Sequence, residues 1–144
     1  MLRSLSKAYG LAGARVGYLV VPAALAERFD AARLPESVAT PSEALAIAAI
    51  AGADSARARR AEVIGERDRL ATALSRLGCT VLPSVANFVA FRPPDASLLA
   101  AGLQARGLIV RHYVAGPMAG WLRATARSTA ENDRLLDALE ELLR

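Results

Sequence analysis

The segment Val16–Val21 restricts the possible folds more than any other part of the chain. It is an almost continuous apolar run, and Pro22 ends it. A short run of this kind, without polar alternation, is typical of a strand that is buried on both faces of a sheet. Such a strand needs a covering layer on each side, and the segments that follow it have helical patterns. The chain is therefore predicted to belong to the α/β class.

Start and stop signals predict where the helices and strands lie. Four polar residues are candidate helix caps: Thr40, Asp54, Asp95 and Ser128. The first and last of these begin capping boxes, and glycines follow two of the helices. Helices are predicted over residues 23–34, 40–51, 54–77, 95–106 and 128–144. Strands are predicted over residues 2–6, 16–21, 79–83, 87–92, 108–113 and 121–126.

The pattern changes character along the chain and predicts two domains. Residues 36–144 have the pattern of a helix-flanked, partly antiparallel α+β unit, whereas residues 1–35 have that of the end of another unit. In the long helix, much of the apolar face is assigned to Ile64, Leu70, Leu74 and Leu77. Its charged residues Glu66, Arg67 and Arg69 are expected to face solvent.

Charge and cysteine content exclude several classes of function. The formal net charge is +4, which favours anionic ligands. Nucleic acid is a poor candidate, because the arginines are scattered and no basic run is interleaved with aromatic residues. Cys79 is the single cysteine, so neither a disulfide nor a cysteine metal site is expected. No signal peptide or membrane span is recognisable, and the expected compartment is the cytosol.

The stretch from Ser4 to Tyr18 contains the residues suited to chemistry. Lys7, the only lysine, follows a predicted strand and is surrounded by small residues that let a flat group approach the backbone. The hydroxyls of Ser4 and Ser6 and the guanidinium of Arg15 suit a phosphate. A lysine beside a phosphate site is the arrangement that a lysine-linked phosphate cofactor needs. A surface lysine on a glycine-containing turn is the alternative for a lone Ser-x-Ser-Lys match.

The full pattern, Ser-Leu-Ser-Lys followed by Gly-Leu-Ala-Gly-x-Arg-x-Gly-Tyr, resembles the lysine signature of class I/II aminotransferases. These are fold-type I enzymes that depend on pyridoxal 5'-phosphate (PLP). The resemblance implies that Lys7 bears the cofactor and moves a proton at the substrate, and that Ser4, Ser6 and Arg15 help to bind the cofactor. It also implies that residues 1–35 are a remnant of the large PLP-binding domain and residues 36–144 the C-terminal small domain.

Motifs further along the chain extend the resemblance toward histidinol-phosphate aminotransferases. Arg123, in Gly-Trp-Leu-Arg-Ala-Thr, matches the arginine that pairs with the anionic group of the substrate. Arg111 matches a second arginine that assists with a phosphate, although an exposed strand-end residue is the alternative. Asn87 matches a pocket residue, and a structural role at a strand edge is equally open.

Two positions depart from the family pattern. Arg127 stands where the family has glycine, and it either alters specificity or faces solvent. His112, the only histidine, is expected to be a structural or rim residue, because the lysine performs the acid–base work in this family. The segment from residue 112 to 117 is also atypical. These departures bear on the substrate rather than on the family.

The resemblance implies transamination of histidinol phosphate with 2-oxoglutarate, in a homodimer, with an amino donor and a 2-oxo acid as substrates. An aromatic amino-acid aminotransferase and a cobalamin-pathway decarboxylase of an amino-acid phosphate share most of the motifs. A non-catalytic dimerisation module is the alternative of another class. A whole family member has roughly 200 further residues before this point, a domain-sized stretch. Without those residues the strand Val16–Val21 is expected to lack the rest of its sheet and to expose its apolar faces. The chain alone is expected to be an inactive fragment.

Overall fold

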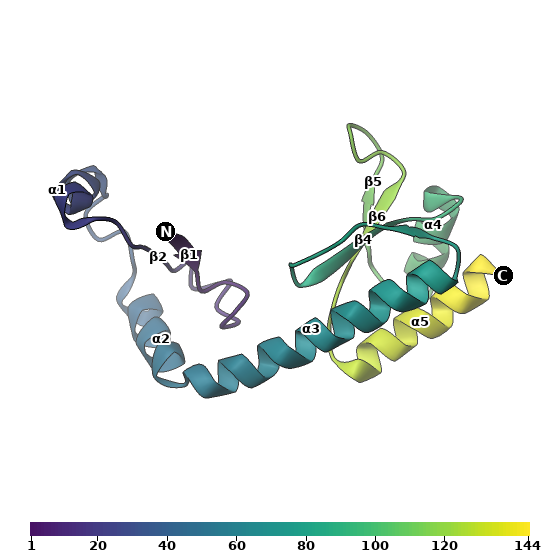
Figure 1. The fold of residues 1–144 in the computed structure, drawn as a ribbon, viewed down its shortest axis with the longest axis horizontal. Helices are drawn as coiled ribbons and strands as arrows, with labels where there is room; N and C mark the ends of the chain where they lie inside the picture. The colour runs from purple at the N-terminus through teal and green to yellow at the C-terminus, as the bar shows by residue number, and fades with distance from the viewer. The chain divides into compact units, whose positions relative to one another are not determined.

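The computed structural model describes residues 1–144, which form two compact units, Met1–Arg60 and Ala61–Arg144 (Figure 1). The first unit contains strands β1 (Leu2–Ser4) and β2 (Gly17–Leu19) and helices α1 (Ala23–Ala32) and α2 (Thr40–Ala51). Helix α3 (Ala53–Arg76) begins in this unit and continues into the second. The predicted division after residue 35 concerns the domains of a whole family member and stays a prediction.

Strands β1 and β2 form an antiparallel pair in which Ser4 lies opposite Gly17. Glycine is required at position 17, because a Cβ there would come within 2.6 Å of the Arg3 carbonyl oxygen. The apolar run Val16–Val21 is typical of a strand buried in a complete sheet, but in this chain most of its residues are exposed, as expected for a strand that lacks the rest of its sheet. Tyr18, for example, is 46% exposed. The physical reason is that β2 pairs with β1 alone and has no second neighbouring strand.

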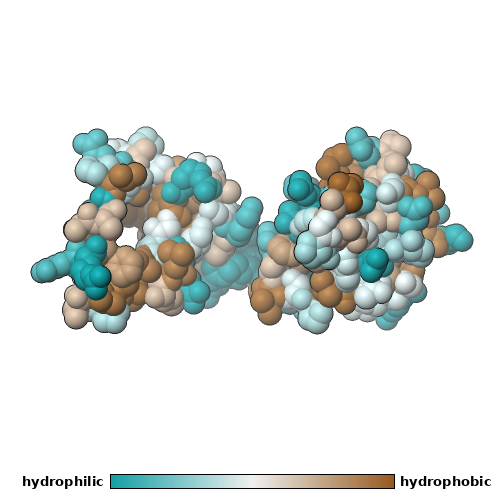
Figure 2. Space-filling view, turned by 90° about the horizontal axis from the view of Figure 1, so that it is seen from above, coloured by the Kyte–Doolittle hydropathy of each residue, from teal (hydrophilic) through white to brown (hydrophobic).

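Apolar side chains are correspondingly common on the surface of the first unit, and several are visible in brown in Figure 2. Beyond those of β2, they come from α1 and α2 and include Leu25, Phe29, Leu45, Ile47 and Ile50. Exposed apolar surface of this extent is typical of surface that another protein segment covers. No helix of the chain is both long and apolar enough to cross a membrane.

The second unit is built on a four-stranded antiparallel sheet with the strand order β3-β4-β6-β5. Its strands are β3 (Thr80–Val81), β4 (Phe88–Arg92), β5 (Arg111–Tyr113) and β6 (Trp121–Thr125). Helices α4 (Ala96–Ala105) and α5 (Thr129–Leu143) complete the unit together with the second part of α3. The α+β character predicted for this part of the chain is confirmed.

One face of this sheet forms the core. Side chains alternate along each strand, so Val89 and Phe91 of β4 and Leu122 of β6 point to the same side, where each is 0% exposed. They pack there against helix residues that include Leu70, Leu74, Leu103 and Leu139. Cys79 is buried in the same cluster, as predicted, and burial raises the pKa of its thiol. The opposite face of the sheet carries Phe88, Arg111, Tyr113 and Arg123.

The helix starts were only partly predictable. Asp95 caps α4 by accepting a hydrogen bond from the Leu98 amide, and Ser128 forms a capping box with Glu131, as predicted. The predicted cap at Thr40 is wrong, because Ala39 is the N-cap and Thr40 already lies inside α2. A cap must have non-helical backbone geometry, which a residue within the first turn lacks. Asp54 also lies in the first turn of α3, where it pairs with Arg57.

The face assigned to α3 needs a correction as well. Glu66, expected in solvent, is only 9% exposed, and the Arg67 side chain is 13% exposed. Ile64, expected in the core, is 48% exposed. The reason is tertiary: α5 docks on the side of α3 that carries Glu66, and supplies polar partners for that carboxylate. Periodicity cannot reveal such a polar contact between two helices.

Candidate active site

The segment around Lys7 is a loop closed by backbone hydrogen bonds. The Leu5 amide donates to the Val16 carbonyl at 3.0 Å, and the Leu11 amide donates to the Leu5 carbonyl at 3.3 Å. Leu5 is 2% exposed and anchors the loop. Ser4 ends β1, and its Oγ accepts a hydrogen bond from the Ser6 amide at 3.1 Å. Lys7 is exposed on this loop.

Arg15 closes the other side of the same loop. Its φ of 55° lies in the left-handed region, which is uncommon for a residue other than glycine. The guanidinium donates one hydrogen bond to the Ala12 carbonyl at 2.8 Å. Its other donors, like the two serine hydroxyls and the lysine ammonium on the same loop, are of the chemical type that suits a phosphate-bearing cofactor. An added Cβ at Gly10 or Gly13 would meet nothing within 4 Å, so a flat group has space there.

Two arginines lie side by side on the open face of the second unit's sheet. Arg111 of β5 is directly opposite Arg123 of β6 in the strand register. The Arg123 guanidinium lies 4.9 Å from the centroid of the Phe88 ring, and its Nε is buried without a hydrogen-bond partner. Arg111 lies over the Tyr113 ring at 5.7 Å. A buried donor without a partner is costly unless a ligand satisfies it.

These arginines line a cavity of about 690 Å³ within the second unit. Arg127 and Arg134 line it too, together with a single carboxylate, Glu131. Arg127 is paired with Glu131 at 2.6 Å, whereas no carboxylate of the chain pairs with Arg111, Arg123 or Arg134. Because positive charge outweighs negative charge in its lining, the cavity favours an anion with more than one negative charge.

Asn87 lies just before β4, and its carbonyl accepts a hydrogen bond from the Ala126 amide at 3.0 Å. Its side chain is half-buried and is not part of the cavity lining. The backbone bond fits the strand-edge role, and the pocket role of the side chain stays a prediction.

His112 lies opposite Leu122 in the register, on the helix-covered side of the sheet, and is half-buried at the cavity wall. This position is consistent with a rim residue. The Arg127 side chain pairs with Glu131 and is 63% exposed, so it faces solvent. It also lines the cavity, and a role in specificity therefore stays a prediction.

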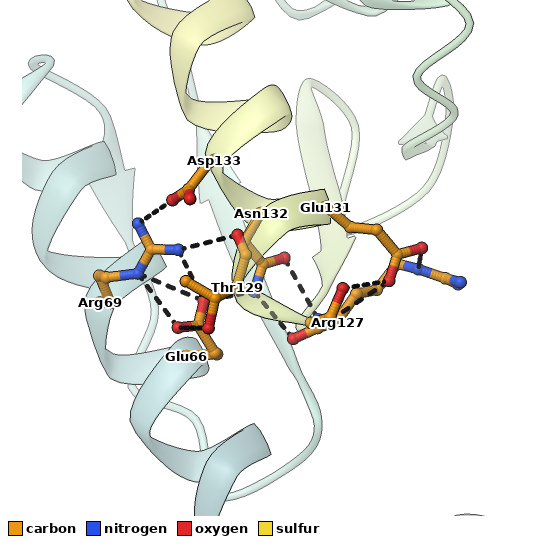
Figure 3. Close-up of polar contacts among 8 residues, drawn as sticks. Glu66, Arg69, Arg127, Thr129, Glu131, Asn132 and Asp133 are labelled. Carbon is orange, nitrogen blue, oxygen red and sulfur yellow. Dashed lines mark hydrogen bonds and ion pairs between the residues drawn. The ribbon is translucent and has the colours of Figure 1, made fainter.

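A polar network that joins α3 to the start of α5 was not foreseen from the sequence (Figure 3). Glu66 of α3 accepts hydrogen bonds from Asn132 Nδ2 at 2.8 Å, Thr129 Oγ1 at 3.0 Å and Arg69 Nη2 at 2.7 Å. Asn132 is 1% exposed. One signal was present: Asn132 precedes Leu135, Leu136 and Leu139 by three, four and seven residues, so it occupies a polar place on the apolar stripe of α5.

The network makes the stability of the second unit depend on pH. Hydrogen bonds from Arg69, and then from Asn132 and Thr129, hold the pKa of Glu66 below its ordinary value of 4.5, against an opposing effect of burial. A carboxyl with a lowered pKa stabilises the fold above its unfolded-state pKa, and this contribution is lost as the pH falls through the folded-state value. We expect the urea concentration at the unfolding midpoint to decrease as the pH is lowered below about 4.5. The Glu66→Gln variant should show a weaker dependence of this midpoint on pH.

Glu131 is the control for that experiment. Ser128 and then Arg127 lower its pKa as well, but Glu131 is exposed. Glu131→Gln should therefore remove a smaller part of the pH dependence than Glu66→Gln does. An unchanged pH profile in the Glu66 variant would contradict the role given to the network.

Comparison with known proteins identifies the family. The sequence model described as aminotransferase class I and II matches residues 1–139. The chain belongs to this family. A curated relative, the histidinol-phosphate aminotransferase of Nitratidesulfovibrio vulgaris (strain Hildenborough), is 39% identical over 145 residues, which cover 99% of the chain and 39% of the relative. The chain thus spans about two fifths of the length of the curated relatives it matches.

Solved aminotransferase-family structures share the fold of the chain. Histidinol-phosphate aminotransferase from Sinorhizobium meliloti, in complex with pyridoxal-5'-phosphate, superposes with a TM-score of 0.84 at 34% identity. The match covers 99% of this chain and 40% of that one. L-threonine-O-3-phosphate decarboxylase from Porphyromonas gingivalis superposes with a TM-score of 0.80 at 29% identity, over 99% of this chain and 46% of that one. The prediction of a partial fold-type I aminotransferase is confirmed.

Proposed function

We propose that the chain supplies the cofactor lysine and the substrate-anion site of a PLP-dependent histidinol-phosphate aminotransferase. Lys7, Ser4, Ser6 and Arg15 form its cofactor half. Arg123 and Arg111 form its anion site, with Asn87 at the nearby strand edge. The observation that supports this most strongly is the pair of arginines facing each other across β5 and β6 without a carboxylate partner.

Each part of the cofactor half has a physical task. The hydroxyls of Ser4 and Ser6 and the guanidinium of Arg15 would donate to the cofactor phosphate, and the absence of side-chain bulk at Gly10 and Gly13 leaves the surface of the loop open to a flat group. The cofactor, when bound, supplies an electron sink for the bonds at the substrate's Cα. Once the substrate amine has displaced Lys7 from the cofactor, the Lys7 amine would act as the base that removes the proton from the substrate's Cα. The remaining cofactor contacts of a whole enzyme lie outside this chain.

The anion site selects the substrate by its charge. Arginine forms paired hydrogen bonds with phosphate oxygens, and two adjacent guanidiniums match the two charges of a phosphate monoester. The Phe88 ring under Arg123 restricts the guanidinium to one plane, which reduces the entropy lost on binding. Histidinol phosphate combines this group with an amine, as the proposed reaction requires.

Titration of the chain with histidinol phosphate and with histidinol tests the proposal. A hydrogen bond to a charged group contributes about 1.5–3 kcal/mol, so we expect binding of the phosphate to be roughly 10- to 100-fold tighter. Arg123→Gln should remove most of this difference. Arg106→Gln is the charge-matched control, because Arg106 lies on α4 and pairs with Glu141 outside the cavity. Equal affinity for the two compounds would refute the anion site.

A second candidate function shares the same anion chemistry. Decarboxylation of an amino-acid phosphate is favoured by the similarity to the Porphyromonas gingivalis enzyme. Both candidates require a phosphate and a primary amine, and they differ in the bond that breaks at Cα. A direct comparison of histidinol phosphate with threonine phosphate in the same titration distinguishes them, since the tighter ligand identifies the substrate class.

The proposal extends to the assembly. Residues 1–35 would belong to the large domain of the whole enzyme and residues 36–144 to its small domain. The whole enzyme would be a cytosolic homodimer that uses an amino donor and a 2-oxo acid. A chain that binds neither PLP nor a phosphate compound would instead favour a non-catalytic interaction module.

A further inference from the structure

The turn between β6 and α5 is held by one buried side chain. Asn132 Oδ1 accepts a hydrogen bond from the Arg127 amide at 3.2 Å, and Asn132 Nδ2 donates to the Arg127 carbonyl at 3.1 Å. Both backbone polar groups of Arg127 are therefore bonded to the same amide, as Figure 3 shows. This fixes the backbone four residues after Arg123.

Asn132 is itself oriented by Glu66. The Glu66 carboxylate accepts from Asn132 Nδ2 and from Thr129 Oγ1, both in the first turns of α5. Arg69 donates to the same carboxylate and pairs with Asp133 at 2.8 Å. A carboxylate on α3, more than 60 residues away in the sequence, thus determines where the amide of Asn132 points.

The strand itself fixes only one side of the same segment. Thr125 pairs with Phe88 of β4, and the Ala126 amide donates to the Asn87 carbonyl. Strand β5 pairs with β6 only from Trp121 to Arg123, so the end of β6 has no neighbour on its other side. The Asn132 side chain instead provides hydrogen bonds to the backbone of Arg127, just after the end of β6, where no neighbouring strand pairs with it.

The orientation of Arg123 depends on this backbone. Its Nε has no hydrogen-bond partner, and no carboxylate pairs with its guanidinium. Its guanidinium is placed by its strand and by the Phe88 ring. A displacement of the β6 end would therefore move Arg123, Thr125 and Arg127 within the cavity lining.

We propose that Glu66 and Asn132 are positioning residues for the anion site, which they serve by holding the turn that follows β6. This inference rests on the proposed function, since it presumes that Arg123 and Arg111 bind the substrate's anion. Asn132 lines the cavity, but it is only 1% exposed and both polar atoms of its side chain are bonded to Arg127 and Glu66, so neither it nor Glu66 needs to contact that anion. Their effect is on affinity and geometry, because a misplacement of about 1 Å can cost as much as 10²-fold in a positioned site.

The experiment measures inorganic phosphate affinity by NMR titration of the 144-residue chain, at temperatures where each variant is folded. Asn132→Ala is expected to weaken phosphate binding about tenfold, as losses of supporting hydrogen bonds do at other preorganised sites. Glu66→Gln should weaken it in the same direction. Exchange of the Arg127 amide should become faster in both variants, because its acceptor is lost or displaced.

Two controls separate positioning from general stability. Asp133→Ala removes an exposed member of the same network that does not touch Arg127, and should leave phosphate affinity within about twofold. Leu139→Ala removes a fully buried core side chain and should lower the thermal midpoint without changing phosphate affinity. If Asn132→Ala does not fold, Thr129→Val replaces it, since that change removes only the hydroxyl bonded to Glu66.

The outcomes distinguish the two proposals. If Arg123→Gln leaves phosphate affinity unchanged, or the chain binds no phosphate, the anion site is refuted and the positioning role with it. If Arg123→Gln weakens binding but Asn132→Ala and Glu66→Gln do not, only the positioning role is overturned. Equal weakening by Leu139→Ala would also overturn it, because the effect would then follow stability.

Discussion

Replacement of Lys7 by alanine is expected to abolish site-specific capture of PLP. The aldehyde of the cofactor reacts with primary amines, and borohydride reduction makes the product permanent. The chain offers only two such amines, the Lys7 side chain and the Met1 α-amine. Because the Met1 amine donates a hydrogen bond to the Val20 carbonyl, whereas Lys7 lies on the loop beside Ser4, Ser6 and Arg15, the label should map to Lys7.

Peptide mapping after reduction makes this test quantitative. The label on the Lys7 peptide should disappear in Lys7→Ala and in Lys7→Arg, which keeps the charge but offers no primary amine. Arg15→Gln should reduce the labelling at low cofactor concentration, because it removes a phosphate donor. Labelling divided equally between Lys7 and Met1, and unchanged in Arg15→Gln, would mean that the loop has no affinity for the cofactor.

Replacement of Phe91 by alanine is expected to have the largest effect on stability. Phe91 is fully buried on β4, where it contacts both neighbouring strands and the helix layer. Such a truncation typically costs about 3–5 kcal/mol, through lost burial and the cavity that remains. A domain of this size has a total stability of roughly 4–12 kcal/mol, so much of the second unit's stability would be lost.

Phe88 provides the matched control in the same strand. It is three residues earlier, on the opposite face of the sheet, and only half-buried. Phe88→Ala should lower the free energy of unfolding, measured by urea denaturation, by less than half as much as Phe91→Ala does. It should instead weaken phosphate binding, because the contact with Arg123 is lost. Equal destabilisation by the two substitutions would show that the core does not lie on the helix-covered face alone.

Local sequence signals predicted the ends of helices well where one hydrogen bond between nearby residues fixes the end. Asp95 and Ser128 were identifiable as caps because a cap bonds to amides two or three residues away. Thr40 has the same local pattern but lies within α2, since the preceding residue takes the cap position. The strand expected over residues 108–113 contracts to Arg111–Tyr113, because only these residues find partners on β6.

Some residues of the candidate site could be predicted from local sequence, whereas others become neighbours only in the folded structure. Lys7, Ser4 and Arg15 were identifiable because their spacing within one loop is itself the motif. Arg111 and Arg123 were identified separately, but only the register of β5 and β6 makes them neighbours. The Glu66–Asn132 contact joins residues 66 positions apart. A polar residue on an apolar stripe indicates a partner without saying which one.

By itself, the sequence determined the family, the element order and the residues available for chemistry, since all three depend on local spacing along the chain. Tertiary structure alone decided that Glu66 is buried and that Ile64 is exposed. Burial depends on which segments pack together, and these segments are far apart in the sequence. Hydrogen bonds that satisfy a buried carboxylate form only after that packing has brought its donors within reach.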